Sequence, residues 1–514
     1  MKSTYQLLLV FYILVFPYVS AQKTLFETYK AQKLAGQETT LPDFSYAGYE
    51  YGEKAIPHID YKLFNVKDFG AVPDDEKSDK QAIQRCIDAA VANGSGIVYF
   101  PKGLYLVNES GESEKPIVIN GTGIVLRGET GAVLFMKEHM KALNPKQLWT
   151  TPYLFQFKKK MKRSQPINVL EDASAGGFVL KVENTAGLSA GDWIELNLQN
   201  NDPLRVAKEL SPYHAQPEWT EINQKGVIVK VFHKIKNVSN HEIVLADPLM
   251  YPVVAADKWT LNRWEPAKGC GVENLHFKGN FHDKFVHHRS AIDDGGWSLL
   301  MISGQANSWM KDCIFEDMNN AARVQQCANY TVLNCKIIGN GGHAAISSEG
   351  SSRVLIAKCD DSASQWHTFG VAKPAMNTVI WRCTSAPTTC FESHASQPRN
   401  TLIDNQKGGF VISHYGGAIG SLPNHLQNLI LWNYTATNTD VYSGYEFWDS
   451  KDKWLKIPMP IIAGFKAANI TFNQQQLKSA ESLNGRTTPE SLYEAQLELR
   501  LGKLPQWLMD VKGK

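Results

Sequence analysis

Short apolar runs at nearly constant intervals dominate the hydrophobic pattern between residues 309 and 434. Each run interleaves Val, Ile, Leu or Thr with polar residues and contains a Cys or an Asn near its end. Such alternation predicts β-strands, and no interval has room for a strand plus a full helix. The runs are Trp309–Phe315, Tyr330–Ile337, Ser352–Cys359, Asn377–Cys383, Asn400–Asn405 and Gln427–Asn433.

A repeat period links these runs. Aligned on the late Cys or Asn of each run, successive anchors are 22, 24, 24, 22 and 28 residues apart. A strand-only repeat of this length predicts the stacked coils of a parallel β-helix, about 4.8 Å apart. We expect a buried ladder of free thiols and a turn ladder of asparagines, with disulfides between adjacent coils as the alternative. The anchors are Cys313, Cys335, Cys359, Cys383, Asn405 and Asn433.

The N-terminal pattern predicts a targeting segment. An apolar run over Leu7–Val19 ends in small residues, which is typical of a signal peptide cleaved after Ala21. We therefore expect a secreted or periplasmic protein. Residues 22–62 are polar and aromatic and predict an extended leader that packs on the body.

The next segment carries a family resemblance. The sequence DFGAVPDD, residues 68–75, precedes a helical pattern over Ser78–Ala92 and a strand pattern over Gly96–Val107. This order resembles the opening of the pectate-lyase-like superfamily of right-handed parallel β-helices. The resemblance, with the repeats, covers roughly residues 62–470 and implies that the helix caps the open end of the solenoid. Members of the superfamily include lyases, hydrolases, epimerases and adhesins, so the resemblance implies the fold more strongly than the reaction.

Other patterns interrupt or end the coils. Alternating segments such as Trp193–Leu198 predict a small antiparallel insertion. Near the C-terminus, Thr488 and Pro489 predict the start of a helix that caps the other end. The chain is thus expected to be all-β. Its predicted parts are a signal peptide (1–21), the leader (22–62), the β-helix start with its capping helix (63–149), the insertion (150–262), the coils with the site (263–472) and a C-terminal helix and tail (473–514).

The composition narrows the classes of molecule that the protein is expected to bind. The 514 residues are 43% hydrophobic and 20% charged, with a net charge of +2, as in ordinary globular proteins. The sequence has no basic arm or heptad pattern, so we expect no nucleic-acid partner. After the signal there is no apolar run long enough to span a bilayer. The eight cysteines form no CxxC pair, so we expect no structural zinc site.

Histidines concentrate where the coils repeat. Nine of the fourteen lie between residues 276 and 425, although histidine is not a favoured core residue. Aligning the coils places His343 with His367, and Glu349 with Lys373. Taken singly, such residues are at least as well explained by a surface ion pair or a turn. Taken together, we expect one exposed face with Arg323, Gln325, Glu349, Lys373, Glu392, His394, His414 and Tyr415.

This set of side chains suits β-elimination from a uronic acid. The reaction needs a group that neutralises the C5 carboxylate, a base for the C5 proton and an acid for the leaving oxygen at C4. Polysaccharide lyases of the resembled superfamily use this repertoire. We predict Lys373 or His394 as base and His414 or Tyr415 as acid. Predicted substrate contacts are Arg323, Gln325, Arg399, Glu349, Glu392, His343 and His367, with Trp297 and Trp366 stacking on sugar rings.

The sequence therefore predicts a carbon–oxygen lyase whose substrate is an anionic polysaccharide or its oligosaccharides, of ulvan, alginate, glycosaminoglycan or pectin type. It would cleave chains or, as a dehydratase, remove water from a terminal uronate. An excursion over residues 280–298, with His287 and His288, would then close one end of the groove.

Two other functions stay open. A polygalacturonase-type hydrolase needs paired carboxylates, for which Asp360, Asp361 and the Gly341–His343 motif are candidates, in reversed order and without that family's other signatures. A non-catalytic carbohydrate-binding solenoid is the other. No cofactor is expected, although Glu349, Asp360, Asp361 and Glu392 leave calcium as an alternative.

Overall fold

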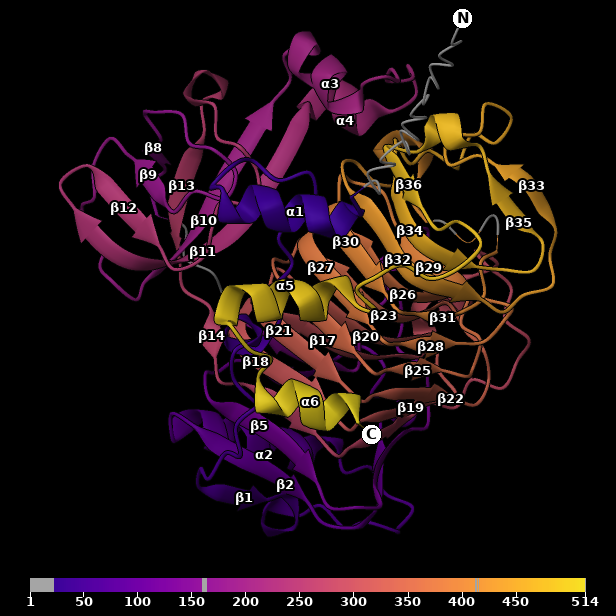
Figure 1. Ribbon diagram of the computed structural model, residues 1–514. Coiled ribbons are helices and arrows are strands. Elements are labelled where there is room, and N and C mark those ends of the chain that lie inside the picture. Colours follow the sequence, from indigo (N-terminus) through magenta and orange to yellow (C-terminus); the bar gives the residue numbers. More distant parts are fainter. Residues whose placement is uncertain (1–22, 160–163, 412–413, 415, 514) are drawn as a thin grey trace, which may run out of the picture.

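The chain winds into a parallel β-helix with three sheets along its length (Figure 1). The computed structural model describes residues 23–159, 164–411, 414 and 416–513. The predicted signal peptide lies outside these residues. Because β-strands of successive coils pair in parallel throughout, the predicted fold class is confirmed.

Most coils contribute one strand to each of these sheets, and sheets 1 and 2 are continuous with one another through the strand over Leu429–Ala436. Sheet 1 consists of β1 (Leu63–Asn65), β2 (Gly96–Phe100), β5 (Ile124–Gly128), β14 (Ala267–Lys268), β15 (Gly271–Glu273), β18 (Gln305–Lys311), β21 (Ala328–Leu333), β24 (Leu355–Ala357), β27 (Met376–Trp381), β30 (Arg399–Asp404), β32 (Leu429–Ala436), β34 (Ile461–Lys466) and β36 (Ser479–Glu481). Sheet 2 consists of β3 (Gly103–Val107), β6 (Ala132–Met136), β16 (His276–Lys278), β19 (Ile314–Glu316), β22 (Lys336–Ile338), β25 (Asp360–Asp361), β28 (Thr384–Ser385) and β31 (Lys407–Gly408). Sheet 3 consists of β4 (Ile117–Ile119), β7 (Phe155–Lys158), β17 (Ser298–Ser303), β20 (Asn320–Gln325), β23 (Ala344–Glu349), β26 (His367–Ala372) and β29 (Cys390–Ser393).

Stacked identical or similar side chains fill the interior. Phe277 and Phe315 stack on neighbouring coils with ring centroids 5.3 Å apart. All eight cysteines are buried and free, so the predicted thiol ladder is confirmed and the disulfide alternative is wrong. At the turns, Asn329 donates from Nδ2 to Oδ1 of Asn307 on the preceding coil at 3.1 Å. Both asparagines have positive φ, which Asn tolerates better than most residues.

Helix α2 (Lys80–Ala92) covers the N-terminal end of the solenoid, as predicted. Its buried face presents Ile83, Cys86, Ile87 and Ala90 to the interior cluster of the first coils. The apolar residues of the first coil have no coil before them, so without this helix they would be exposed to water.

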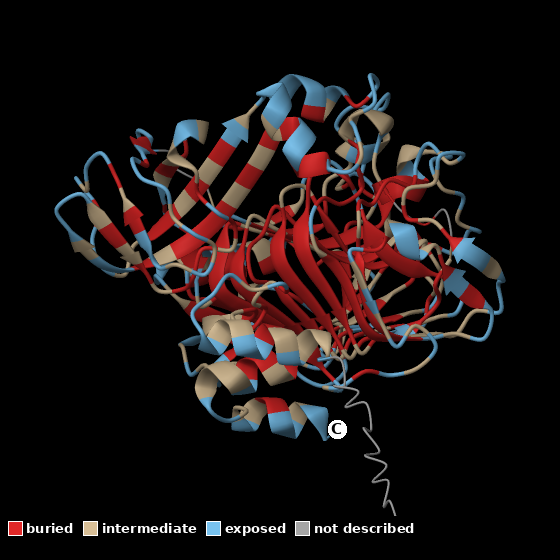
Figure 2. Cartoon of the chain, turned by 45° about the horizontal axis from the view of Figure 1, so that its top comes forward, coloured by how far each residue is buried: buried red, intermediate tan, exposed pale blue. Residues whose placement is uncertain are grey.

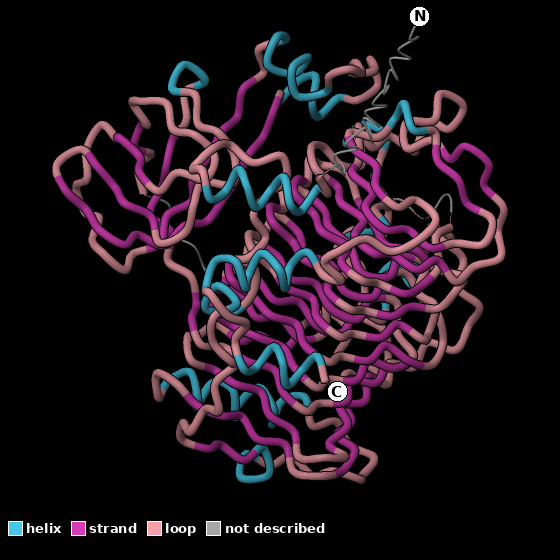
Figure 3. Tube along the Cα trace, in the orientation of Figure 1, coloured by secondary structure: helices cyan, strands magenta, loops and turns pink. Residues whose placement is uncertain are grey.

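Three helices lie across the outward side of sheet 1 (Figures 1 and 3). They are α1 (Leu25–Leu34), α5 (Leu492–Leu501) and α6 (Gln506–Lys512). The predicted extended leader therefore contains a helix, which begins with a capping box formed by Thr24 and Glu27. The prediction that the C-terminal helix caps the far end was wrong. Leu492 and Leu497 of α5 instead pack, in one apolar cluster, with outward residues of several coils, including Trp381 and Trp432.

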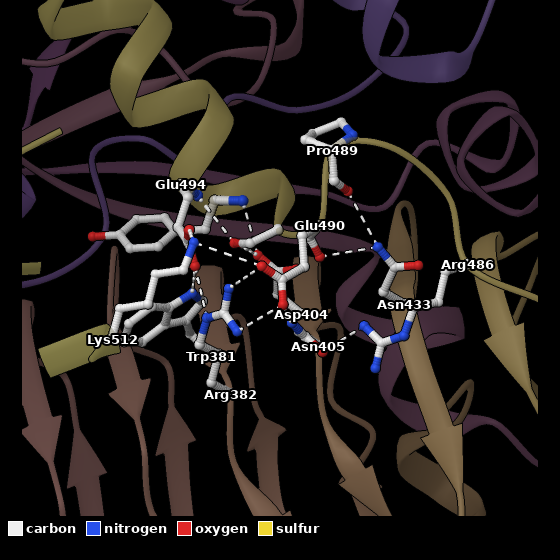
Figure 4. Close-up of polar contacts among 12 residues, drawn as sticks. Trp381, Arg382, Asp404, Asn405, Asn433, Arg486, Pro489, Glu490, Glu494 and Lys512 are labelled. Carbon is white, nitrogen blue, oxygen red and sulfur yellow. Dashed lines mark hydrogen bonds and ion pairs between the residues drawn. The ribbon is translucent and has the colours of Figure 1, made fainter. Parts of the chain in front are cut away.

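Paired charges fix α5 and α6 on sheet 1 (Figure 4). Arg382 donates to Glu494 at 2.7 Å and to Glu490 at 3.0 Å, and Lys512 donates to Glu494 at 2.7 Å. Asp404 accepts hydrogen bonds from the start of α5, where an anion also interacts favourably with the helix dipole. Helix α5 begins at Leu492 with Ser491 as its cap, three residues later than the sequence predicts.

The insertion is an antiparallel six-stranded sheet with two short helices. Its strands are β8 (Ile167–Asn168), β9 (Val179–Lys181), β10 (Trp193–Asn200), β11 (Val227–Ser239), β12 (Glu242–Leu245) and β13 (Thr260–Trp264), and its helices are α3 (Pro203–Leu210) and α4 (Thr220–Lys225). Two buried ion pairs dock it on the coils: Arg399 to Glu209 and Arg353 to Asp247, each at 2.7 Å. Residues 155–158, predicted to lie in the insertion, form coil strand β7 instead.

The remaining segments complete the surface. Strands β33 (Tyr442–Tyr445) and β35 (Ile470–Phe472) pair beside the last coils. The strands are mostly buried, whereas the helices present exposed residues to solvent (Figure 2). Among the described residues, no helix combines the length and apolar character needed to cross a membrane.

Candidate active site

Backbone register brings distant residues into one row on the outward side of sheet 3. Arg323, Ser347, Gly370 and Glu392 are successive partners on β20, β23, β26 and β29. A second row contains Gln325, Glu349 and Ala372. Side chains alternate along a strand, so both rows point away from the core, whose sheet 3 members include Val324, Ile346 and Phe369.

A three-residue ion network lies at the centre of these rows. The Glu349 carboxylate forms ion pairs with two cations: it lies 2.7 Å from Arg323 Nε and 2.9 Å from Lys373 Nζ. Burial alone would raise the pKa of Glu349, but the two cations outweigh it and hold this pKa at about 2. The predicted pairing of Glu349 with Lys373 is therefore confirmed. Two cations share one carboxylate, which leaves an excess positive charge at a surface where the Lys373 side chain is 45% exposed.

The backbone at Lys373 is unusual for a lysine. Its φ is +58°, in the left-handed region, and Gly350 occupies the equivalent turn position on the preceding coil. A left-handed conformation costs an L-residue about 1–2 kcal/mol, which Gly avoids. The turn alone thus gives no reason for a lysine here, whereas the ion pair with Glu349 does.

A second pair, Glu392 and His394, lies one coil further along. His394 Nε2 is 3.6 Å from Glu392 Oε1. Burial and the nearby Glu349 raise the pKa of Glu392 to about 8. Partial burial, together with the nearby His343 and Arg323, lowers the pKa of His394 to about 4, against the opposing effect of Glu349. At neutral pH the pair is therefore a neutral carboxylic acid beside a neutral imidazole.

Two glycines make room for this pair. A Cβ on Gly370 would lie 2.6 Å from Glu392 Cβ. A Cβ on Gly416 would lie 2.3 Å from Glu392 Oε1 and closer still to the His394 ring. Both positions require glycine on steric grounds, so the pair is closely enclosed on the sides that these backbones occupy.

Aromatic rings and further histidines border the charged rows. His343 and His367 have ring centroids 5.4 Å apart, as their predicted alignment implies, although the register shifts by one residue. The loop 280–298 brings His287 over them, and its ring stacks on Trp366 at 5.0 Å. Trp366 also stacks on His414 at 4.1 Å. A pocket of about 350 Å³ beside this cluster is lined by Lys284, Phe285, Asn340, Gly341, Gly342, Ser364, Gln365, Trp366, Thr388 and His414.

The structure places some predicted site residues elsewhere. Arg399 is buried in sheet 1, where it binds Glu209 of the insertion and cannot reach a ligand on sheet 3. Trp297 is 8% exposed and belongs to the interior cluster. Tyr415 lies outside the described residues. Asp361 is fully buried in β25 of sheet 2, so the Asp360–Asp361 pair does not join His343.

Two residues at the site were not predicted from the sequence. Tyr153, two residues before the start of β7, lies beside Arg323, whose guanidinium carbon is 5.2 Å from the ring centroid. Burial raises the pKa of Tyr153 to about 12. His287 was assigned only to a loop that closes the groove. The sequence prediction placed Tyr153 in the insertion and so did not identify it as a site residue. Recognising Phe155–Lys158 as a coil strand would have placed Tyr153 next to sheet 3.

Comparison with known proteins supports the fold family. Residues 63–161 match the family model described as rhamnogalacturonase A/epimerase, pectate lyase-like. The predicted resemblance is thereby confirmed. Residues 364–511, which include Lys373, Glu392 and His394, match the model described as domain of unknown function (DUF4955).

Sequence relatives share only short stretches with this chain. Mannuronan C5-epimerase AlgE1 of Azotobacter vinelandii is 45% identical over 67 residues, which are 13% of this chain and 5% of that protein. Alginate lyase 7 of the same organism is 42% identical over 65 residues, 13% of this chain and 8% of that protein. Among solved structures, the tailspike protein gp49 from Pseudomonas phage LKA1 aligns with a TM-score of 0.47 and 13% identity, covering 78% of this chain and 63% of that one.

Proposed function

We propose that this protein removes the C5 proton of a uronic acid residue in an anionic polysaccharide and eliminates the substituent at C4. The observation that carries the proposal is the neighbouring placement of three functions on sheet 3. Arg323 and Lys373 supply excess positive charge, His394 is a neutral base, and Glu392 is a protonated acid. These are the functions that β-elimination requires.

The reaction assigns one step to each group. The carboxylate of the sugar binds beside Lys373 and Arg323, whose charge stabilises the negative charge that develops as the C5–H bond breaks. His394 takes that proton. The electron pair forms the C4–C5 double bond, the C4–O4 bond breaks, and the leaving oxygen takes the proton of Glu392. Atoms and charge balance without a redox partner.

These assignments revise the acid expected from the sequence. Either His414 or Tyr415 was expected to act as the acid, but burial lowers the pKa of His414 and its ring stacks on Trp366. Its backbone carbonyl instead accepts a hydrogen bond from His367 Nδ1 at 2.7 Å, so we assign it a positioning role. Glu392 replaces it as the acid, and Tyr415 stays a prediction.

We infer that the substrate is of alginate type. The short stretches in common with a mannuronan epimerase and an alginate lyase support a mannuronate-containing polymer more than pectin, ulvan or a glycosaminoglycan. Epimerisation is the second candidate. It begins with the same removal of the C5 proton and differs only in that a proton returns to the opposite face, and the relative named above is such an epimerase.

Product analysis separates the candidates. The full chain is incubated with polymannuronate, and the ultraviolet absorbance of the unsaturated uronate is followed while products are examined by NMR in deuterated water. We expect absorbance to rise with wild type and to stay flat with Glu392→Gln. Deuterium at C5 without absorbance would instead establish epimerisation. New reducing ends without either signal would establish hydrolysis, and binding without any product would establish a carbohydrate-binding solenoid.

A further inference from the structure

We propose that His287, His343 and His367 form a binding site for one divalent transition metal ion of the zinc type. The three residues come from the loop 280–298, the turn before β23 and the first position of β26. One ring nitrogen from each lies within 4.8 Å of the other two. Within the described residues, this is the only cluster of at least three His, Cys, Asp or Glu side chains with such spacing.

Hydrogen bonds fix which nitrogen of two rings is free. His343 Nδ1 lies 2.9 Å from the carbonyl oxygen of Asp294, and His367 Nδ1 lies 2.7 Å from that of His414. A carbonyl oxygen only accepts, so each Nδ1 carries the proton and each Nε2 has a free lone pair. A ring N–H donated to a carbonyl is the usual outer contact of a metal-binding histidine.

Among the described residues, the Nε2 lone pair of His367 accepts no hydrogen bond. Its side chain is 2% exposed, and Nε2 has no hydrogen-bond partner among the described residues. The carboxyl oxygen Oε1 of Glu392 is 3.6 Å away, beyond hydrogen-bond distance. A buried acceptor without a partner destabilises the folded protein, and a bound cation would remove that cost.

An aromatic neighbour also prepares the site. Stacking on Trp366 orients the His287 ring. Tetrahedral zinc with bonds of about 2.0–2.1 Å needs nitrogens roughly 3.3 Å apart, so the rings would move inward by about 1 Å.

Three neutral histidines leave a fourth position open, as in catalytic rather than structural zinc sites. Glu392 and His394 are neighbours of this site: Glu392 Oε1 is 3.6 Å from His367 Nε2, and the His394 and His367 ring centroids are 6.2 Å apart. If the proposed function holds, the ligand for the fourth position is the uronate carboxylate, which the metal ion would neutralise together with Lys373.

Metal titration of the full chain tests the site independently of any sugar. Chelator-treated protein is titrated with Zn²⁺ by calorimetry and with Co²⁺ by absorption. We expect one equivalent of metal ion to bind wild type. The affinity of His287→Gln and of His343→Gln should be lower by about 100-fold or more. His282→Gln is the matched control, because His282 is an exposed histidine of the same loop whose Nε2 contacts Asn280 instead. Thermal unfolding of the metal-free variants confirms that each is folded.

The outcomes separate this site from the proposed reaction. No Zn²⁺ binding, or equal binding by wild type and His287→Gln, would overturn the site even if elimination is observed. Intact metal binding without elimination would refute the reaction and leave the site standing. With Co²⁺ bound, a uronate oligosaccharide should change the spectrum and a neutral one should not; an unchanged spectrum would overturn the carboxylate contact.

Discussion

Sheets 1 and 3 are built by the same coils, yet their outward sides differ in chemistry. On sheet 1, Trp381 and Trp432 are fully buried beneath α1, α5 and α6. On sheet 3, the outward rows are charged, and the side chains of Lys373 and His394 are each 45% exposed. The coil geometry is common to both sides, so the side chains alone decide which side the helices cover and which side carries exposed charge.

Charge balance shows the same contrast. On sheet 1, Arg382 and Lys512 are matched by Glu490 and Glu494, so the contact is complete within the protein. On sheet 3, Arg323 and Lys373 share Glu349 alone, because the raised pKa of Glu392 keeps that carboxyl group neutral. Matched charges fix a helix in place, whereas an excess positive charge is available to an anionic ligand.

The largest expected effect is on catalysis from sheet 3. His394→Gln should lower kcat for uronate elimination by about 10²–10⁴-fold, because the base for the C5 proton is lost. Its unfolding midpoint should stay near that of wild type, since the His394 side chain is half exposed. Steady-state kinetics and thermal unfolding measure the two quantities. Wild-type turnover by the variant would show that another residue is the base.

On sheet 1 the expected effect is on stability. Trp381→Ala should lower the free energy of unfolding by about 3–5 kcal/mol, because it empties a buried site and removes the indole donor to Glu494. Turnover per folded molecule should not change. Denaturant titration and the elimination assay test this, with the exposed Trp149→Ala as control. If Trp381→Ala lost as much turnover per folded molecule as His394→Gln, sheet 1 would affect catalysis as strongly as sheet 3, and the contrast between the two sides would be wrong.

Two lysines with similar backbone conformations separate the effect of the Lys373 charge from that of its backbone. Lys373→Ala should reduce kcat/KM by about 10–100-fold, the effect of losing a charged contact of about 1.5–3 kcal/mol. Lys358→Ala is the control, because Lys358 also has a positive φ, +52°, at a turn between sheets 1 and 2. Both variants keep an L-residue in the same backbone region, so equal losses would mean that backbone strain, and not the Lys373 charge, determines activity.

The smallest effect is the pH dependence. kcat/KM should rise through pH about 4, as His394 loses its proton, and fall through pH about 8, as Glu392 loses its own. The signs follow because the base acts unprotonated and the acid acts protonated. A pH profile from 3 to 10 in about unit steps measures both limbs. A profile still rising above pH about 8 would exclude Glu392 as the acid.

Sequence periodicity predicted the features that stacking controls. The spacing of the anchors predicted parallel coils, free buried cysteines and the pairing of Glu349 with Lys373, because a period near 24 residues places equivalent positions on adjacent coils. The alignment also predicted His343 beside His367, with an error of one residue where the repeat length changes.

Contacts between distant segments were not predictable from the period. Arg399 lies near His394 in the sequence, yet its guanidinium binds Glu209 of the insertion. Tyr153 reaches Arg323 only because β7 resumes sheet 3 before the insertion begins. The pKa values of Glu392 and His394 depend on burial, which no local pattern reveals.

The sequence by itself thus determined the coil, its capping helix and the collection of Arg, Lys, His and Glu in one repeating region, because strand alternation and repeat spacing are local properties. The tertiary structure alone decided which side the terminal helices cover and which histidine nitrogens are left unpaired. The helices contact strands hundreds of residues away in the sequence, and the histidine nitrogens are fixed by carbonyl groups 47 and 49 residues away, so no local pattern specifies either outcome.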